Sequence, residues 1–198
     1  MADRTPAETQ AYAEGTVNAF YDAITDEEKR EIRSDLKRVV TANARPANKI
    51  KDIYIIVDKA FRHASGRVAC TRGCAHCCYI AVTMTSVEAK CIGEQIGIEP
   101  KDTANAAARN PASFSNDTPC PFLENNECSI YEHRPLECRA HFNFDRDSYW
   151  CRYENAEGAL IPKPVIPQLG AARDLVSMRK NAPPIFGDIM DFFPNGKR

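Results

Sequence analysis

The sequence predicts a mainly α-helical protein, with a small α+β arrangement as the alternative, in which helical segments adjoin an irregular cysteine-rich region. Three observations lead to this fold class. Before residue 66, apolar residues recur at intervals of three and four, which is the spacing of one face of a helix. The Thr-x-x-Glu sequences that begin at Thr25 and Thr85 mark helix starts. Four cysteines then stand within nine residues, CTRGCAHCC, and the helical pattern stops there.

The amino-terminal part, residues 1–66, is predicted to be helical. Thr25 and Glu28 form a capping box, so a helix should begin near Asp26, and Pro46 should end it. Each helix carries one apolar stripe, as expected for a helix that packs on a core. The stripes are Val17, Phe20, Tyr21 and Ile24; Ile32, Leu36, Val39 and Val40; and Ile50, Ile53, Tyr54, Val57 and Phe61.

The cysteine-rich region is predicted to contain one short helix. Thr85 and Glu88 form another capping box, which places a helix over residues 86–95 that ends at Gly97. Residues 99–117 are polar and rich in Ala and Asn, as expected for a connector between two cysteine-bearing segments.

A last helix is expected over residues 169–180, between two proline-containing segments. The patterns together divide the chain into three parts. These are a helical part at 1–66, a cysteine-cluster domain at 67–155, and a carboxy-terminal helix and tail at 156–198 that packs on the same globule.

Composition and charge exclude some classes of function. The formal net charge is −1, which provides no basic footprint for a nucleic-acid partner. No apolar run is long enough to cross a bilayer, and the amino terminus has no apolar signal region, so we expect a cytoplasmic protein without a membrane partner. In a reducing compartment, nine cysteines indicate metal or redox chemistry rather than disulfides.

The spacing of the cysteines predicts metal binding. Gaps of two or three residues let one loop present several thiolates to a metal, as in zinc and iron–sulfur sites. The cofactor expected is therefore zinc or an iron–sulfur cluster, with mononuclear iron less suited to thiolate ligands alone. The candidate ligands are Cys70, Cys74, Cys77, Cys78, Cys120, Cys128, Cys138 and Cys151, the last of which is supported only by the count.

Three of the nine cysteines need separate treatment. Cys77 and Cys78 are adjacent, and neighbouring side chains in an extended segment diverge, so the pair can supply two centres, or one thiol can ligate while the other supports it. Cys91 lies four residues after Val87 on the core face of the predicted helix, and we interpret it as a buried apolar residue.

CTRGCAHCC and the later CPFLENNECSIYEHRPLECR together resemble the YkgJ-like cysteine-cluster family, described as a zinc- or iron-chelating domain. The family has a Cys-rich run ending in Cys-Cys, then Cys-Pro-Phe-Leu, Cys-x-Ile-Tyr and Arg-Pro-x-x-Cys-Arg. Here the run ends at Cys78, and the three later pieces begin at Cys120, Cys128 and Arg134. The first two cysteines are separated by three residues, where the family commonly has two. The resemblance covers about residues 70–151 and implies a metal ion as partner.

The biochemical role beyond metal binding stays open at this level, and so does the question of whether the protein is an enzyme. A flagellin lysine-N-methylase carries a similar cluster, so a protein lysine N-methyltransferase is one alternative by analogy, and an iron–sulfur electron-transfer protein is a second. The Cys-x3-Cys-x2-Cys spacing also occurs in radical S-adenosylmethionine enzymes, but the chain after it is too short for their barrel. His141, three residues after Cys138, could complete a Cys3His site, although a lone His is more often only hydrogen-bonded.

Overall fold

The computed structural model describes residues 4–71, 73–102, 118–155, 158–180 and 182–197, and within them the predicted mainly α-helical class is confirmed. The described helices are α1 (Pro6–Ala23), α2 (Asp26–Thr41), α3 (Pro46–Ala60), α4 (Ser86–Ile96), α5 (Leu136–Ala140), α6 (Pro167–Ser177) and α7 (Ile189–Phe192). The 3₁₀ turns are η1 (Arg62–Ala64), η2 (His76–Tyr79), η3 (Tyr131–His133), η4 (Tyr149–Cys151) and η5 (Tyr153–Asn155). The strands form two antiparallel pairs, β1 (Thr83–Thr85) with β4 (Phe186–Asp188) and β2 (Leu123–Glu124) with β3 (Glu127–Cys128).

Most helix boundaries follow from local capping. The predicted start at Asp26 is confirmed, because Thr25 and Glu28 cap each other's free backbone groups at the start of α2. The predicted end of α4 is also confirmed, since Gly97 adopts φ 72°, a left-handed conformation that favours glycine. The first helix begins at Pro6, before its apolar stripe, because Thr5 forms a capping box that the pattern of apolar residues does not reveal.

The last long helix is shorter than expected. α6 ends at Ser177 rather than at residue 180, because the chain becomes extended at Met178 and Arg179 then pairs with Ala182 in a β-bridge. The hydrogen bonds of this bridge replace those that another helical turn would make.

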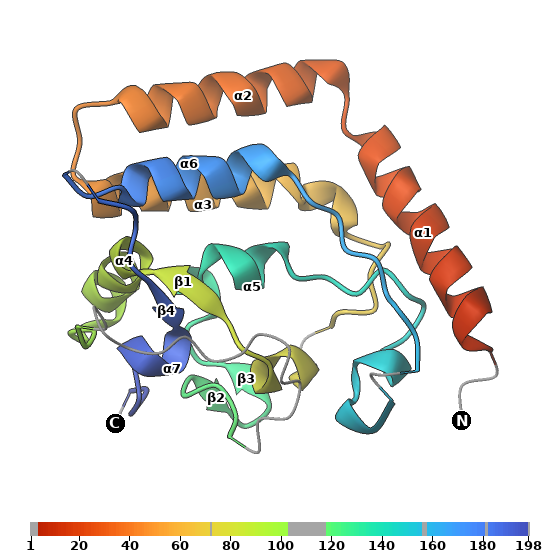
Figure 1. Cartoon of the computed structure of the whole chain (residues 1–198). Helices are drawn as coiled ribbons and strands as arrows, with labels where there is room; N and C mark the ends of the chain where they lie inside the picture. Colours follow the sequence, from red (N-terminus) through yellow and green to blue (C-terminus); the bar gives the residue numbers. More distant parts are fainter. Residues whose placement is uncertain (1–3, 72, 103–117, 156–157, 181, 198) are drawn as a thin grey trace.

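The helices form layers over the cysteine-bearing loops (Figure 1). α2 lies across α3 and α6, α4 and α5 lie on the other side of α3, and α1 runs along one edge. A large apolar core joins α1, α2, α3 and α6 and reaches the cysteine-rich region through Leu136 and Phe144. The apolar stripes of the amino-terminal helices therefore form a core, as the sequence predicts.

A second, smaller core lies beneath α4. It contains Met84, Ile92, Phe122, Ile130 and Phe192, which come from β1, α4, the loops around the β2–β3 hairpin, and α7. The β1–β4 pair joins this core to the carboxy-terminal tail, with Met84 opposite Gly187. The cysteine-rich region is thus packed on both the amino-terminal and the carboxy-terminal parts, and the division at residues 66 and 155 stays a prediction. Of the predicted connector, residues 103–117 lie outside the described residues.

None of the helices in the described part of the chain combines the length and the apolar character that membrane crossing requires.

The carboxy-terminal tail closes over the second cysteine segment at Gly196. This residue has φ 58°, and a Cβ atom added there would lie 2.1 Å from the carbonyl oxygen of Pro121, next to Cys120. We therefore expect Gly196→Ala to destabilise the protein by at least ~1 kcal/mol, because both the backbone conformation and the contact oppose a side chain. Thermal denaturation of this variant beside Gly66→Ala checks the prediction. Gly66 also has positive φ, but a Cβ atom there meets nothing within 4 Å. An equal loss of stability in both variants would therefore contradict the predicted clash with Pro121.

Candidate metal centre

The first cysteine loop is folded by short turns that place its thiols close together. The backbone N–H of Cys74 donates to the carbonyl of Thr71 at 3.0 Å, and that of Cys78 donates to the carbonyl of Ala75 at 2.9 Å. Cys77 and Cys78 lie in η2, so the sequence argument that assumed an extended segment was wrong on this point. In a 3₁₀ turn, consecutive side chains are still about 120° apart around the axis.

The adjacent thiols are hydrogen-bonded to each other, yet they have different surroundings. The Cys78 thiol donates to Cys77, and this bond lowers the pKa of Cys77 to about 7, while it raises the pKa of Cys78. The charges of Cys120 and Cys128 further raise the pKa of Cys78, whereas the cations Arg134 and Lys163 lower the pKa of Cys77. The two thiols are therefore not equivalent.

The second cysteine segment is shaped by the β2–β3 hairpin. Asn125 and Asn126 both have positive φ, 50° and 61°, which is the conformation of a two-residue hairpin turn that Asn tolerates. This turn lies between Cys120 and Cys128 and brings both back to one end of the hairpin, where Leu123 pairs with Cys128. No strand was predicted here, although the Asn-Asn pair was a readable turn signal.

Hydrogen bonds and packing bring the second segment against the first. The backbone N–H of Cys120 donates to the carbonyl of Cys78 at 2.7 Å. Cys120, Cys128 and Cys138 all pack against the smaller apolar core. These four cysteines form what we call the second thiol group: Cys78, Cys120, Cys128 and Cys138.

Cys138 is held in place by a buried carboxylate on α4. Glu88 is 0% exposed and accepts hydrogen bonds from the Tyr54 hydroxyl at 3.0 Å and from the backbone N–H of Leu136 at 3.1 Å. Leu136 is the first residue of α5, which carries Cys138 one half-turn later. Burial raises the pKa of Glu88, and the charge of Arg173 opposes this rise. The capping box read from the sequence therefore also anchors the helix that presents a thiol.

Four other cysteines interact with one another, and one of them, Cys151, lies on the loop that contacts α1 through Trp150. The backbone N–H of Asn143 donates to Sγ of Cys70 at 3.3 Å, and its Nδ2 donates to Sγ of Cys151 at 3.0 Å. The charges of Cys74 and Cys77 act on Cys70, and those of Cys70 and Cys74 act on Cys151. On these interactions we assign Cys70, Cys74, Cys77 and Cys151 to a first thiol group. Cys77 is the member that lies nearest the other group, since its charge acts on thiols of both.

Burial favours the protonated form of most of these thiols. It raises the pKa of Cys138 well above its usual value, and burial is also the main cause that raises the pKa of Cys120 and Cys151, each to about 11. Because a metal binds the thiolate, an ion must displace these protons, so affinity should increase as the pH rises.

Positive side chains compensate part of the thiolate charge. Burial raises the pKa of Cys70 and of Cys128, and the positive charge of Arg134 opposes this rise. Nε of Arg134 is buried without a hydrogen-bond partner among the described residues. Its guanidinium stacks over the Tyr131 ring, 3.9 Å from the centroid. The positive charge of Lys163 also lowers the pKa of Cys77. A site that concentrates thiolates needs such cations nearby.

The arginine and the histidine that follow Cys138 in the sequence have partners other than thiols in the described residues. Arg139 is 6% exposed and pairs with Asp58, and it donates to the backbone carbonyls of Glu132 and Arg134. It is therefore neither a surface ion pair nor a contact of the thiols. Nδ1 of His141 lies 3.4 Å from Nζ of Lys163, and burial, followed by the charge of Lys163, lowers the pKa of His141 to about 4.

The two groups contain the ligands of metal sites, but their side chains do not surround one common ion position. Eight thiols divide into two sets of four, the number of ligands in structural zinc sites and in [4Fe–4S] clusters. Within the described residues, no three or more His, Cys, Asp and Glu side chains have the geometry to hold an ion as they stand. Sulfur atoms on turns and on a five-residue helix can approach one another by side-chain rotation.

Residues 69–155 match the family model described as "CxxCxxCC: Putative zinc- or iron-chelating domain". The match covers less than half of the chain, and we call the matched segment the CxxCxxCC domain. All eight candidate ligands lie within the CxxCxxCC domain, and the resemblance read from the motifs is confirmed. The description of the family supports metal binding by the domain. No curated protein and no solved structure matches the chain.

Cys91 is the one cysteine of the CxxCxxCC domain outside both groups. It is 1% exposed and belongs to the large core, as predicted, and burial raises its pKa to about 11. It also lines a cleft of about 290 Å³ between α3 and α4, which contains no other cysteine.

We expect Cys91→Ser to leave metal content unchanged and to lower the free energy of unfolding by roughly 1–3 kcal/mol, since a buried hydroxyl without a partner is costly. Elemental analysis and denaturant unfolding test both halves of this prediction. Cys91→Ala should keep metal content with a smaller stability loss, and reduced metal in either variant would contradict the assignment.

Proposed function

We propose that the CxxCxxCC domain binds two metal centres, each through one thiol group. The first centre uses Cys70, Cys74, Cys77 and Cys151, and the second uses Cys78, Cys120, Cys128 and Cys138. The observation that carries the proposal is the division of eight thiols into two sets of four around the hydrogen-bonded pair Cys77 and Cys78. The bound group is zinc or an iron–sulfur cluster, since both take four thiolates.

The packing supports a structural contribution of the metal to the domain. The second group borders the smaller apolar core, and the first is linked to α1 through the loop that bears Cys151. Metal ligation would draw these loops together, because four ligands on separate segments then share one centre. A role in storing, delivering or sensing the metal is compatible with the same ligands, and neither a methyltransferase nor an electron carrier has a specific observation in its favour.

The test is metal analysis of the full chain purified without oxygen, combined with an ultraviolet–visible spectrum and thiol titration under native conditions. Two zinc ions per chain with a colourless protein, or iron with visible absorption, would support the proposal. Cys138→Ala and Cys151→Ala should each lower the metal content by one centre. Protein that contains no metal and whose eight thiols all titrate freely would refute the proposal.

A further inference from the structure

Asn143 connects the two ends of the CxxCxxCC domain. Its backbone N–H donates to Sγ of Cys70 at 3.3 Å, and its side-chain Nδ2 donates to Sγ of Cys151 at 3.0 Å. Its backbone carbonyl accepts from the N–H of Ala69 at 2.9 Å. One residue therefore holds the first and the last thiol of the first group. Because it is neither Cys nor His, its place among metal-site residues is not readable from the sequence.

The orientation of the Asn143 amide is determined by the loop that follows it. Its Oδ1 accepts from the backbone N–H of Asp145 at 2.9 Å, and its Nδ2 donates a second bond, to the carbonyl of Asp147, also at 2.9 Å. A flipped amide would point an oxygen at this carbonyl and an NH₂ group at an N–H. Asn143 is 5% exposed, so water cannot readily replace these bonds.

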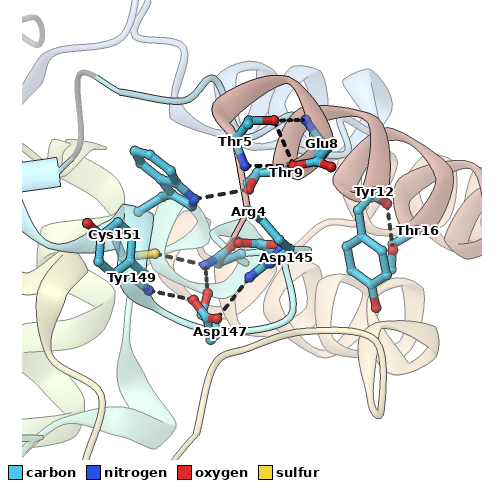
Figure 2. Close-up of polar contacts among 12 residues, drawn as sticks. Arg4, Thr5, Glu8, Thr9, Tyr12, Thr16, Asp145, Asp147, Tyr149 and Cys151 are labelled. Atoms are coloured by element: carbon cyan, nitrogen blue, oxygen red, sulfur yellow. Dashed lines mark hydrogen bonds and ion pairs between the residues drawn. The ribbon is translucent and has the colours of Figure 1, made fainter. Parts of the chain in front are cut away.

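The amino-terminal segment supports this loop from outside (Figure 2). Arg4 forms ion pairs with Asp145 and with Asp147, the latter at 2.8 Å. The Asp145 side chain is fully buried, and its Oδ2 has no hydrogen-bond partner among the described residues, so Arg4 compensates a charge that would be costly alone. Nε1 of Trp150, next to Cys151, donates to the Thr9 hydroxyl at 3.0 Å and ties the same loop to α1.

We propose that Asn143 is a positioning residue of the first metal centre, which gives an N–H donor to each of Cys70 and Cys151 and depends on Arg4 and Asp145 for its orientation. This inference rests on the proposed function. An N–H donor to a thiolate stabilises its negative charge and fixes the direction from which sulfur meets the metal. The inference also places Cys151, the ligand that the cysteine pattern supports least, with Cys70.

The decisive variant is Asn143→Asp in the full chain. Aspartate has nearly the same shape but presents an oxygen, and at neutral pH a negative charge, to the Cys151 sulfur. The probes are zinc, titrated in competition with a chromophoric chelator, and Co²⁺, whose absorption reports thiolate ligation. We expect a loss of ~10 to 100-fold in affinity at one of the two centres, together with a changed Co²⁺ spectrum for that centre, while the other binds as before.

Two further variants separate positioning from general stability. Asn155→Asp is the matched control, since its Nδ2 donates to the carbonyl of Tyr149 at 3.0 Å in the same loop and contacts no thiol, so it should bind both ions normally. Leu36→Ala removes core packing on α2, which carries none of the candidate ligands, and should lower stability without lowering affinity. Arg4→Gln should weaken the same centre as Asn143→Asp, because the loop loses its ion pairs.

The outcomes distinguish this inference from the proposed function. Wild-type affinity at both centres of Asn143→Asp would overturn the role of Asn143, and so would an equal loss of affinity in Leu36→Ala. Wild-type protein that binds neither zinc nor Co²⁺ would instead overturn the two-centre function itself.

Discussion

Removal of the metal with a chelator is expected to unfold the CxxCxxCC domain locally while α2 and α3 stay folded. The thiols lie on turns, a hairpin with a two-residue turn and a five-residue helix, and the apolar core beside them is the smaller one. Four-thiolate zinc sites contribute binding free energies on the order of 10 kcal/mol, a quantity comparable with the stability of a whole domain. The amino-terminal helices instead depend on the large apolar core, which contains Phe20, Ile50 and Val57 at 0% exposure.

Amide hydrogen exchange read by mass spectrometry, with and without chelator, measures this effect. Peptides from residues 73–80 and 118–151 should lose most of their protection, those from α2 and α3 should keep theirs, and added zinc or iron should restore the original pattern. Unchanged protection of the cysteine-bearing peptides after complete metal removal would show that the metal does not stabilise the domain.

Replacement of Cys77 and replacement of Cys78 are expected to have different effects on metal content. Cys78 is bonded through its carbonyl to Cys120 and feels the charges of Cys120 and Cys128, so Cys78→Ser should remove the second ion and spare the first. Cys77 belongs to the first group, and its charge also acts on Cys138. Cys77→Ser should therefore remove the first ion and also weaken the second by ~10 to 100-fold.

Metal stoichiometry and zinc affinity, measured side by side in the two serine variants, distinguish two metal centres from a single site that both thiols ligate. Cys91→Ser serves as the control for loss of a thiol without loss of a ligand, because Cys91 lies in the core. Complete and identical loss of metal in both folded variants would count against two centres and favour a single site that both thiols ligate.

The sequence alone determined the mainly α-helical fold class and which cysteines are candidate metal ligands. Helical spacing of apolar residues and the capping boxes at Thr25 and Thr85 act within a few residues, so they predicted where α2 and α4 begin. The short gaps between cysteines likewise indicated metal chemistry, and Cys91 was separated from the ligands by its position on a helix face. Each of these inferences depends on forces that operate along a short stretch of chain.

Only the tertiary structure decided how the thiols are grouped. The hydrogen bond from Cys120 to Cys78 and the bond from Asn143 to Cys70 join residues that are distant in the chain, and no local pattern encodes such contacts. Asn143 also donates to Cys151, so it brings the two cysteines together. The same holds for Glu88, which reads as a helix cap in the sequence. Its buried carboxylate is also the anchor of α5, because folding places the amide of Leu136 where the remaining lone pairs of Glu88 need a donor.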